Sequence, residues 1–180
     1  MPPFDLNVVE LREHNPPADT APLLWVLSTS WPCQTLAQCH AVAQAYSARW
    51  LIEEYHKALK TGTGIEKSQL GTARGLQALL GILALVAVRL LKLKMLARSA
   101  PEQELDPDEL GEEALAVLAA LYGVPKGGWT YRSTLTAIAR LGGFLARRGD
   151  GDPGWLTIWR GWRRLVPLCE GYSLGIGKCG

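Results

Sequence analysis

The stretch YSARWLIEEYHKALK, Tyr46–Lys60, decides how the rest of this chain is interpreted. It contains no proline or glycine, and its residues favour a helix. On a helix that turns about 100° per residue, its polar and charged side chains share one narrow stripe. These residues are Tyr46, Arg49, Glu53, Lys57 and Lys60. Ile52, Tyr55 and Leu59 fall on a second, apolar stripe, so the helix is predicted to be amphipathic.

The charged stripe has two interpretations. Glu53 lies four residues after Arg49 and four before Lys57, and each such pair supports an exposed helix by about 0.2–0.5 kcal/mol. Spacing alone therefore favours a solvated face. Against this, the stripe combines Tyr46 with an arginine, and a guanidinium group suits bidentate phosphate binding. Trp50 adjoins it as an aromatic stacking surface, so the stripe is also a candidate binding site.

Composition restricts the class of protein only loosely. A length of 180 residues suits one domain or a small domain with an appendage, and 48% apolar residues allow a packed core. The net charge of +2 does not by itself predict a nucleic-acid partner. However, cations cluster at 57–67, 89–98 and 147–164, while 102–113 is acidic, so a locally basic face is compatible with this total.

The N-terminal half is predicted to be β-then-α. LNVVELREH (6–14) and LLWVLSTS (23–30) have the composition of strands, and the proline-rich turn between them favours a hairpin. Thr35 is the predicted N-cap of one long helix, 36–60, which TGTG at 61–64 ends.

Only helices are predicted after that point. Their expected ranges are 72–98, 109–122 with Asp108 as cap, a helix from Thr130 or Ser133 to Arg148, and 155–171. Gly142–Gly143 marks a kink or a close helix crossing, and the glycine-rich tail after 171 is expected to fray. The fold class is α+β, mostly α, with domains 1–100 and 101–180 meeting near the break at 99–108.

A membrane span and a zinc site are both disfavoured. The apolar run 78–88 is shorter than the roughly 20 residues that a bilayer needs, and Arg89 follows it, so a buried core helix is expected. The four cysteines form no CxxC pair, and Cys33, Cys39 and His40 lack the usual zinc spacing. Reduced cytoplasmic thiols and no secretion signal are expected.

The spacing Tyr-(2)-Arg-(3)-Glu-(6)-Lys of Tyr46, Arg49, Glu53 and Lys60 resembles the signature of DDE-type DNA transposases of the insertion-sequence-4 family. RWLIEEYHKALKTGTG around it resembles the transposon-5-type enzymes in particular. Four more blocks resemble the same family in the same order: NPPADTAPLLWVLSTS, LVAVRLLKLK, LTAIARLGGFLARR and WRGWRRLVPLCEGY. The resemblance therefore covers nearly the whole chain.

The resemblance implies a remnant of a ribonuclease-H-like catalytic domain, two strands plus long helices, followed by an all-helical dimerisation domain. Glu53 matches the catalytic, metal-binding glutamate of an Asp-Asp-Glu set that holds two Mg²⁺ or Mn²⁺ ions for phosphoryl transfer. Tyr46, Arg49 and Lys60 match residues that grip transposon-end double-stranded DNA. Trp50 and Lys57 are assigned to the same surface.

The chain departs from the family pattern upstream of the glutamate. Asp5 and Asp19 are the only aspartates before Glu53, and neither matches a catalytic position. One carboxylate does not build a two-metal site. We therefore expect a C-terminal fragment of a cut-and-paste transposase, bacterial, cytoplasmic and nucleoid-associated when bound to DNA, that neither cleaves nor joins DNA alone. Its expected partners are transposon-end DNA and a second chain, either itself or a full-length transposase, joined through the C-terminal helices.

Trp155, Trp159 and Trp162 share one stripe of the last helix. This stripe is either part of the core, an aromatic dimer interface or, less favoured, a single-strand binding surface. The alternative for the whole chain is a helical interaction or regulatory module that never touches DNA, for example an inhibitor that heterodimerises with a full-length transposase.

Overall fold

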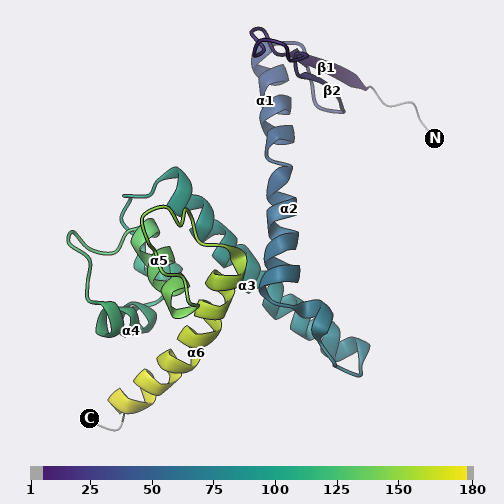
Figure 1. Cartoon of the computed structure of the whole chain (residues 1–180). Coiled ribbons are helices and arrows are strands. Elements are labelled where there is room, and N and C mark those ends of the chain that lie inside the picture. The colour runs from purple at the N-terminus through teal and green to yellow at the C-terminus, as the bar shows by residue number, and fades with distance from the viewer. Residues whose placement is uncertain (1–5, 178–180) are drawn as a thin grey trace. The chain divides into compact units, whose positions relative to one another are not determined.

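The computed structural model describes residues 6–177 and divides into two compact units, Met1–Glu53 and Glu54–Gly180 (Figure 1). The boundary between them falls inside one helix, α2 (Trp50–Lys57). Each unit has a hydrophobic cluster of its own.

The N-terminal unit is a β-hairpin with a helix. Strands β1 (Asn7–Arg12) and β2 (Leu24–Thr29) pair antiparallel, with Asn7 opposite Thr29. Helix α1 (Leu36–Ser47) packs on the hairpin through a small cluster of Val9, Leu27 and Val42. The predicted hairpin is confirmed, because the proline-rich segment between the strands reverses the chain as expected.

The prediction of one continuous helix from 36 to 60 is wrong. Thr35 caps α1 through a capping box with Gln38, as expected of its N-terminus. After α1 the backbone hydrogen bonds change from the four-residue spacing of an α-helix to a three-residue spacing. The Arg49 amide, for example, donates to the Tyr46 carbonyl at 2.9 Å. This tight turn separates α1 from α2. A π-helical turn, η1 (Ala58–Gly62), and Gly64 at φ 66° end the helical run where the sequence predicted.

The C-terminal unit consists of four longer helices around one core. They are α3 (Ala73–Ser99), α4 (Glu112–Tyr122), α5 (Tyr131–Leu141) and α6 (Trp155–Gly177). Each contributes a fully buried side chain: Leu90, Leu118, Ile138 and Ile158. Helix α3 shares this core with helices that follow residue 100. The domain boundary predicted near residue 100 stays a prediction.

Helix boundaries follow the caps. Thr72 caps α3, at the place where a helix was expected to begin. Thr130, one of the two predicted starts of the fourth helix, caps α5 in a capping box with Ser133. The predicted start of the third helix is wrong, since Asp106 instead caps a short 3₁₀ turn, η3 (Pro107–Glu109), and Gly111 at φ 92° separates it from α4. The fourth helix was predicted to reach Arg148 but ends at Leu141.

Helix α6 is longer than predicted. It continues through Pro167 to Gly177, so the expectation of a frayed segment immediately after residue 171 is wrong. The last residues of that predicted tail, 178–180, lie outside the described part of the chain.

Two glycines let α5 and α6 cross at backbone distance, which decides between the two interpretations of Gly142–Gly143. A Cβ on Gly142 would lie 1.8 Å from the Thr157 carbonyl oxygen, and a Cβ on Gly161 would lie 1.8 Å from that of Ile138. Figure 1 shows α5 and α6 side by side. Gly143, at φ 96°, turns the chain out of the helix.

Helix α3 is buried over only part of its length. Ala87, Leu90, Leu93 and Ala97 face the core, but Ile82, Leu85 and Val88 are more than half exposed. By length and composition α3 is the one helix among the described residues that is apolar enough to cross a membrane, and 17% of its most apolar window is buried. The expectation that the apolar run 78–88 is buried is therefore wrong for most of that run, in which only Ala87 is buried. The core contacts of α3 lie in its C-terminal half.

Candidate nucleic-acid interface and metal-ligand position

The N-terminal unit brings together three of the predicted site residues. Arg49 forms an ion pair with Glu53 at 3.0 Å, and its guanidinium carbon lies 5.8 Å from the centre of the Tyr46 ring. Tyr46 in turn meets Trp25 of β2 edge-on, with ring centroids 4.9 Å apart. These contacts hold Tyr46 and Arg49 in defined positions on the surface.

All these side chains remain accessible. Those of Arg49 and Glu53 are 58% and 56% exposed, and Tyr46 and Trp50 each keep 39% of their surface. An exposed Arg–Glu pair contributes little to stability. Both charged groups are therefore available to a ligand: the guanidinium to a phosphate, and the carboxylate to a cation.

The other two predicted DNA-binding residues belong to the C-terminal unit. Lys57, in the last turn of α2, pairs with Glu54 at 3.0 Å. Lys60, in η1, pairs with Glu66 at 3.4 Å, with both side chains at least 60% exposed. Neither lysine forms a pair with Glu53 in the described residues.

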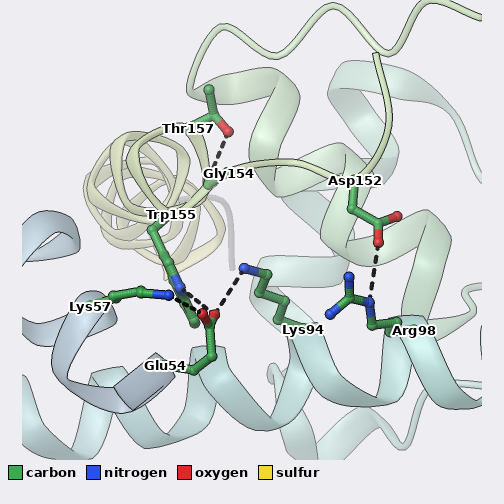
Figure 2. A network of polar contacts seen from close by, with 8 residues as sticks. All are labelled: Glu54, Lys57, Lys94, Arg98, Asp152, Gly154, Trp155 and Thr157. Carbon is green, nitrogen blue, oxygen red and sulfur yellow. Dashed lines mark hydrogen bonds and ion pairs between the residues drawn. The ribbon is translucent and has the colours of Figure 1, made fainter. Parts of the chain in front are cut away.

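Glu54 has a structural role that the sequence alone did not reveal. Figure 2 shows its carboxylate at the centre of a polar network that joins α2, α3 and α6. The Trp155 indole Nε1 donates to Oε2 at 3.0 Å, Lys94 Nζ lies 3.4 Å from the same oxygen, and Lys57 Nζ lies 3.0 Å from Oε1. Lys94 also stacks on the Trp155 ring, 4.4 Å from its centroid.

The network holds Glu54 in its charged form. Partial burial acts to raise the pKa of this carboxyl group, but hydrogen bonds from Lys57 and Trp155 and the charge of Lys94 outweigh it. The pKa of Glu54 therefore lies below its ordinary value. The two consecutive glutamates of α2 thus differ: Glu54 is tied into the scaffold, whereas Glu53 faces solvent.

The described residues do not fit a two-metal centre. Within residues 6–177 no group of three or more His, Cys, Asp or Glu side chains could hold a metal ion. Asp19, the only upstream aspartate in this range, lies in the turn after β1 at φ 62°. Glu53 is therefore the only predicted metal ligand among the described residues.

The predicted tryptophan stripe faces inward. Trp155 and Trp159 are 8% and 9% exposed and belong to the core of the C-terminal unit, and Trp162 packs against the same core. Their proposed part in dimerisation stays a prediction. Helix α6 also carries other apolar side chains, all at least 39% exposed: Leu156, Val166, Leu168, Tyr172 and Leu174.

Protein-family models match almost the entire described chain. A model described as the transposase DDE domain matches residues 8–89. A second, described as the transposase Tn5 dimerisation domain, matches residues 85–176. The first match contains the Tyr46–Lys60 stretch, and the second contains α3 from residue 85 onward, all of α4 and α5, and α6 up to residue 176.

Proposed function

Since the chain belongs to the Tn5-type DDE transposases, we propose that it binds transposon-end DNA through the Tyr46–Lys60 stretch and pairs with a second chain through α6. The family places it in DNA transposition, and its dimerisation domain supports self-association. One observation carries the DNA-binding part. Arg49 and Glu53 lie together, more than half exposed, on a surface buttressed by Tyr46.

The roles of the cations follow from phosphate chemistry. Arg49 offers a planar fork for two oxygens of one phosphate, whereas Lys57 and Lys60 act as point charges. Tyr46 and Trp50 add aromatic surface in the same unit as Arg49. Phosphate contacts of this kind fix the position of DNA without reading its sequence, so we do not assign a recognised sequence to this surface.

Glu53 is proposed as the metal-ligand glutamate of the family. DDE transposases use divalent metal in their complete form. In this chain Mg²⁺ or Mn²⁺ would require further carboxylates beside Glu53, and the residues described do not supply them. We therefore propose that the chain on its own neither cleaves nor joins DNA strands.

The proposed dimer surface lies on the C-terminal part of α6. Leu168 and Tyr172 follow the spacing i, i+4, which places them on one side of a helix inside the dimerisation domain, and both expose apolar area. The buried Trp155 and Trp159 would hold the first turns of α6 against the core. Pairing through α6 would also allow a heterodimer with a full-length transposase. Such a heterodimer would have only one of the two active sites of a full-length dimer.

DNA-acting transposases work in aqueous compartments, and we place this chain in the bacterial cytoplasm, with the nucleoid when bound to DNA. The exposed apolar side of α3 is assigned to protein packing, because Arg89, Lys92 and Lys94 interrupt the apolar run and because Leu90, Leu93 and Ala97 of the same helix are buried in a protein core.

Fluorescence anisotropy with a labelled duplex tests the DNA-binding proposal. Binding should weaken steeply with salt, and Arg49→Ala and Lys60→Ala should each reduce the slope of log K against log salt by about 0.9. Lys126→Ala, which removes an exposed cation from a distant loop, is the matched control. Absence of salt-dependent binding by the unaltered chain would refute the proposal and favour a regulatory module that never touches DNA.

A further inference from the structure

A groove beside the Thr61–Gly64 turn has not been assigned any role. It has a volume of about 530 Å³ and lies between that turn, α3 and one face of α6. Its floor includes Leu83, Leu156 and Trp159. On its rim are three cations, Lys67, Arg160 and Arg163. We call it the α6 groove.

The sequence of α6 explains why apolar and cationic side chains line the same groove. Leu156, Trp159, Arg160 and Arg163 follow the spacing i, i+3, i+4, i+7, which places them on one side of a helix. Trp159 is buried against the core, while both arginines are exposed. Lys67, in η2 (Ile65–Lys67), adds its charge from the opposite wall.

The charge of the groove is not neutralised by any of the residues that the structure describes. No acidic side chain lines it. Among the ion pairs of the described residues none involves Lys67, Arg160 or Arg163, and the neighbouring Glu66 is occupied by Lys60. Three cations that line one groove without ion-pair partners repel one another. A polyanion bound there would relieve this repulsion.

Two features favour a phosphodiester backbone over other polyanions. First, Lys60 immediately precedes the turn that forms one wall, so the groove continues the chain segment already assigned to DNA. Second, Thr61 and Ser68 line the same groove. DNA phosphates are bound by hydroxyl side chains together with Lys and Arg, which is the mixture found here.

We infer that the α6 groove is a second DNA contact, in which Lys67, Arg160 and Arg163 bind backbone phosphates of a duplex. This inference rests on the proposed DNA binding of the chain and adds a site within the dimerisation domain. Helix α6 would then form two interfaces. Its groove side would bind DNA, and its exposed apolar residues on another side would contact the second chain.

The test compares two double variants of the whole chain in the anisotropy assay. Arg160→Ala/Arg163→Ala removes two groove cations, and Arg12→Ala/Lys126→Ala removes two exposed cations elsewhere. The groove variant should lower the salt slope by about 1.8, the value for two lost phosphate contacts. The control should leave the slope unchanged, and Lys67→Ala should lower it by about 0.9.

Each other outcome has a distinct meaning. If the groove variants match the control while Arg49→Ala and Lys60→Ala still weaken binding, the groove assignment is wrong and the proposed function stands. If the unaltered chain binds no duplex, both fail. Polyglutamate binding as tightly as the duplex, with the same loss in the groove variant, would overturn the assignment to phosphodiesters. Unchanged circular dichroism of the variants confirms that they are folded.

Discussion

Trp155 and Glu54 lie 101 residues apart in the sequence, yet the indole Nε1 donates to the carboxylate at 3.0 Å. This hydrogen bond, together with Lys94, fastens the end of α2 to α3 and α6. It shows that the glutamate next to the predicted metal ligand is a structural residue.

Glu54→Ala should destabilise the C-terminal unit by about 1–3 kcal/mol, because it leaves the Trp155 N–H and Lys94 without their shared partner in a part-buried site. Urea unfolding followed by circular dichroism measures the loss. Glu53→Ala is the matched control and should change stability by less than about 0.5 kcal/mol, because its side chain is exposed. Equal effects at both positions would contradict the division between them.

The contribution of Glu54 should depend on pH in a defined direction. Because the pKa of this carboxyl is lower in the folded chain than in the unfolded one, its stabilisation is fully present above the unfolded value of about 4.3. It is lost as the pH falls through the folded pKa. The difference in unfolding free energy between the unaltered chain and Glu54→Gln should therefore shrink on acidification from about pH 6. A constant or growing difference would show that the charge of Glu54 is not what matters.

Gly142→Ala and Gly161→Ala should each destabilise the chain by about 3 kcal/mol or more, since each new Cβ would overlap a carbonyl oxygen of the facing helix. Gly171→Ala is the control, because a Cβ there meets nothing within 4 Å. In the interior of α6 that change should stabilise by up to about 1 kcal/mol. Thermal and urea unfolding separate the two outcomes, and tolerance of alanine at Gly142 would disprove the close crossing.

Leu168→Asp and Tyr172→Asp should weaken self-association by about tenfold or more, equivalent to about 1.4 kcal/mol, by placing a charge in an apolar interface. Sedimentation velocity over a concentration series measures this. Leu145→Asp, at a residue 60% exposed in the loop after α5, should leave the association unchanged. If only Leu145→Asp disrupts the dimer, the interface lies away from α6.

Elements marked by local chemistry were predictable from sequence. Thr35, Thr72 and Thr130 each bond to an amide of the first turn, so their helices begin where the sequence indicates. The proline-rich turn set the hairpin, and Gly64 set the end of the helical run. Each signal acts over three or four residues and needs no partner distant in the chain.

What escaped prediction depends on partners distant in sequence or on subtle backbone changes. The residue types at Ala48–Arg49 do not indicate that the backbone hydrogen bonds change to three-residue spacing there. Pro167 suggests that a helix should stop nearby, yet α6 continues to Gly177. Periodicity placed the three tryptophans on one stripe, but it does not say whether that stripe meets its own core or another chain.

The candidate site shows the same limit. The spacing of Tyr46, Arg49 and Glu53 was visible in the sequence, and the structure brings these residues together. Glu54 looked like one more charge on a helix until the fold supplied Trp155 and Lys94.

Glu53 and Glu54 are neighbours in the sequence, yet natural selection would act on them for different reasons. It would act on Glu54 through folding and on Glu53 through the proposed function. Substitutions at position 54 would lower the amount of folded protein in the cell, whereas those at 53 would leave abundance intact and affect only what the protein does with metal and DNA. In a mutational scan the two neighbours would therefore be detected by different screens, one for cellular abundance and one for binding of metal or DNA. A transposon lineage that has lost mobility would be free to vary the first glutamate while still being held to the second.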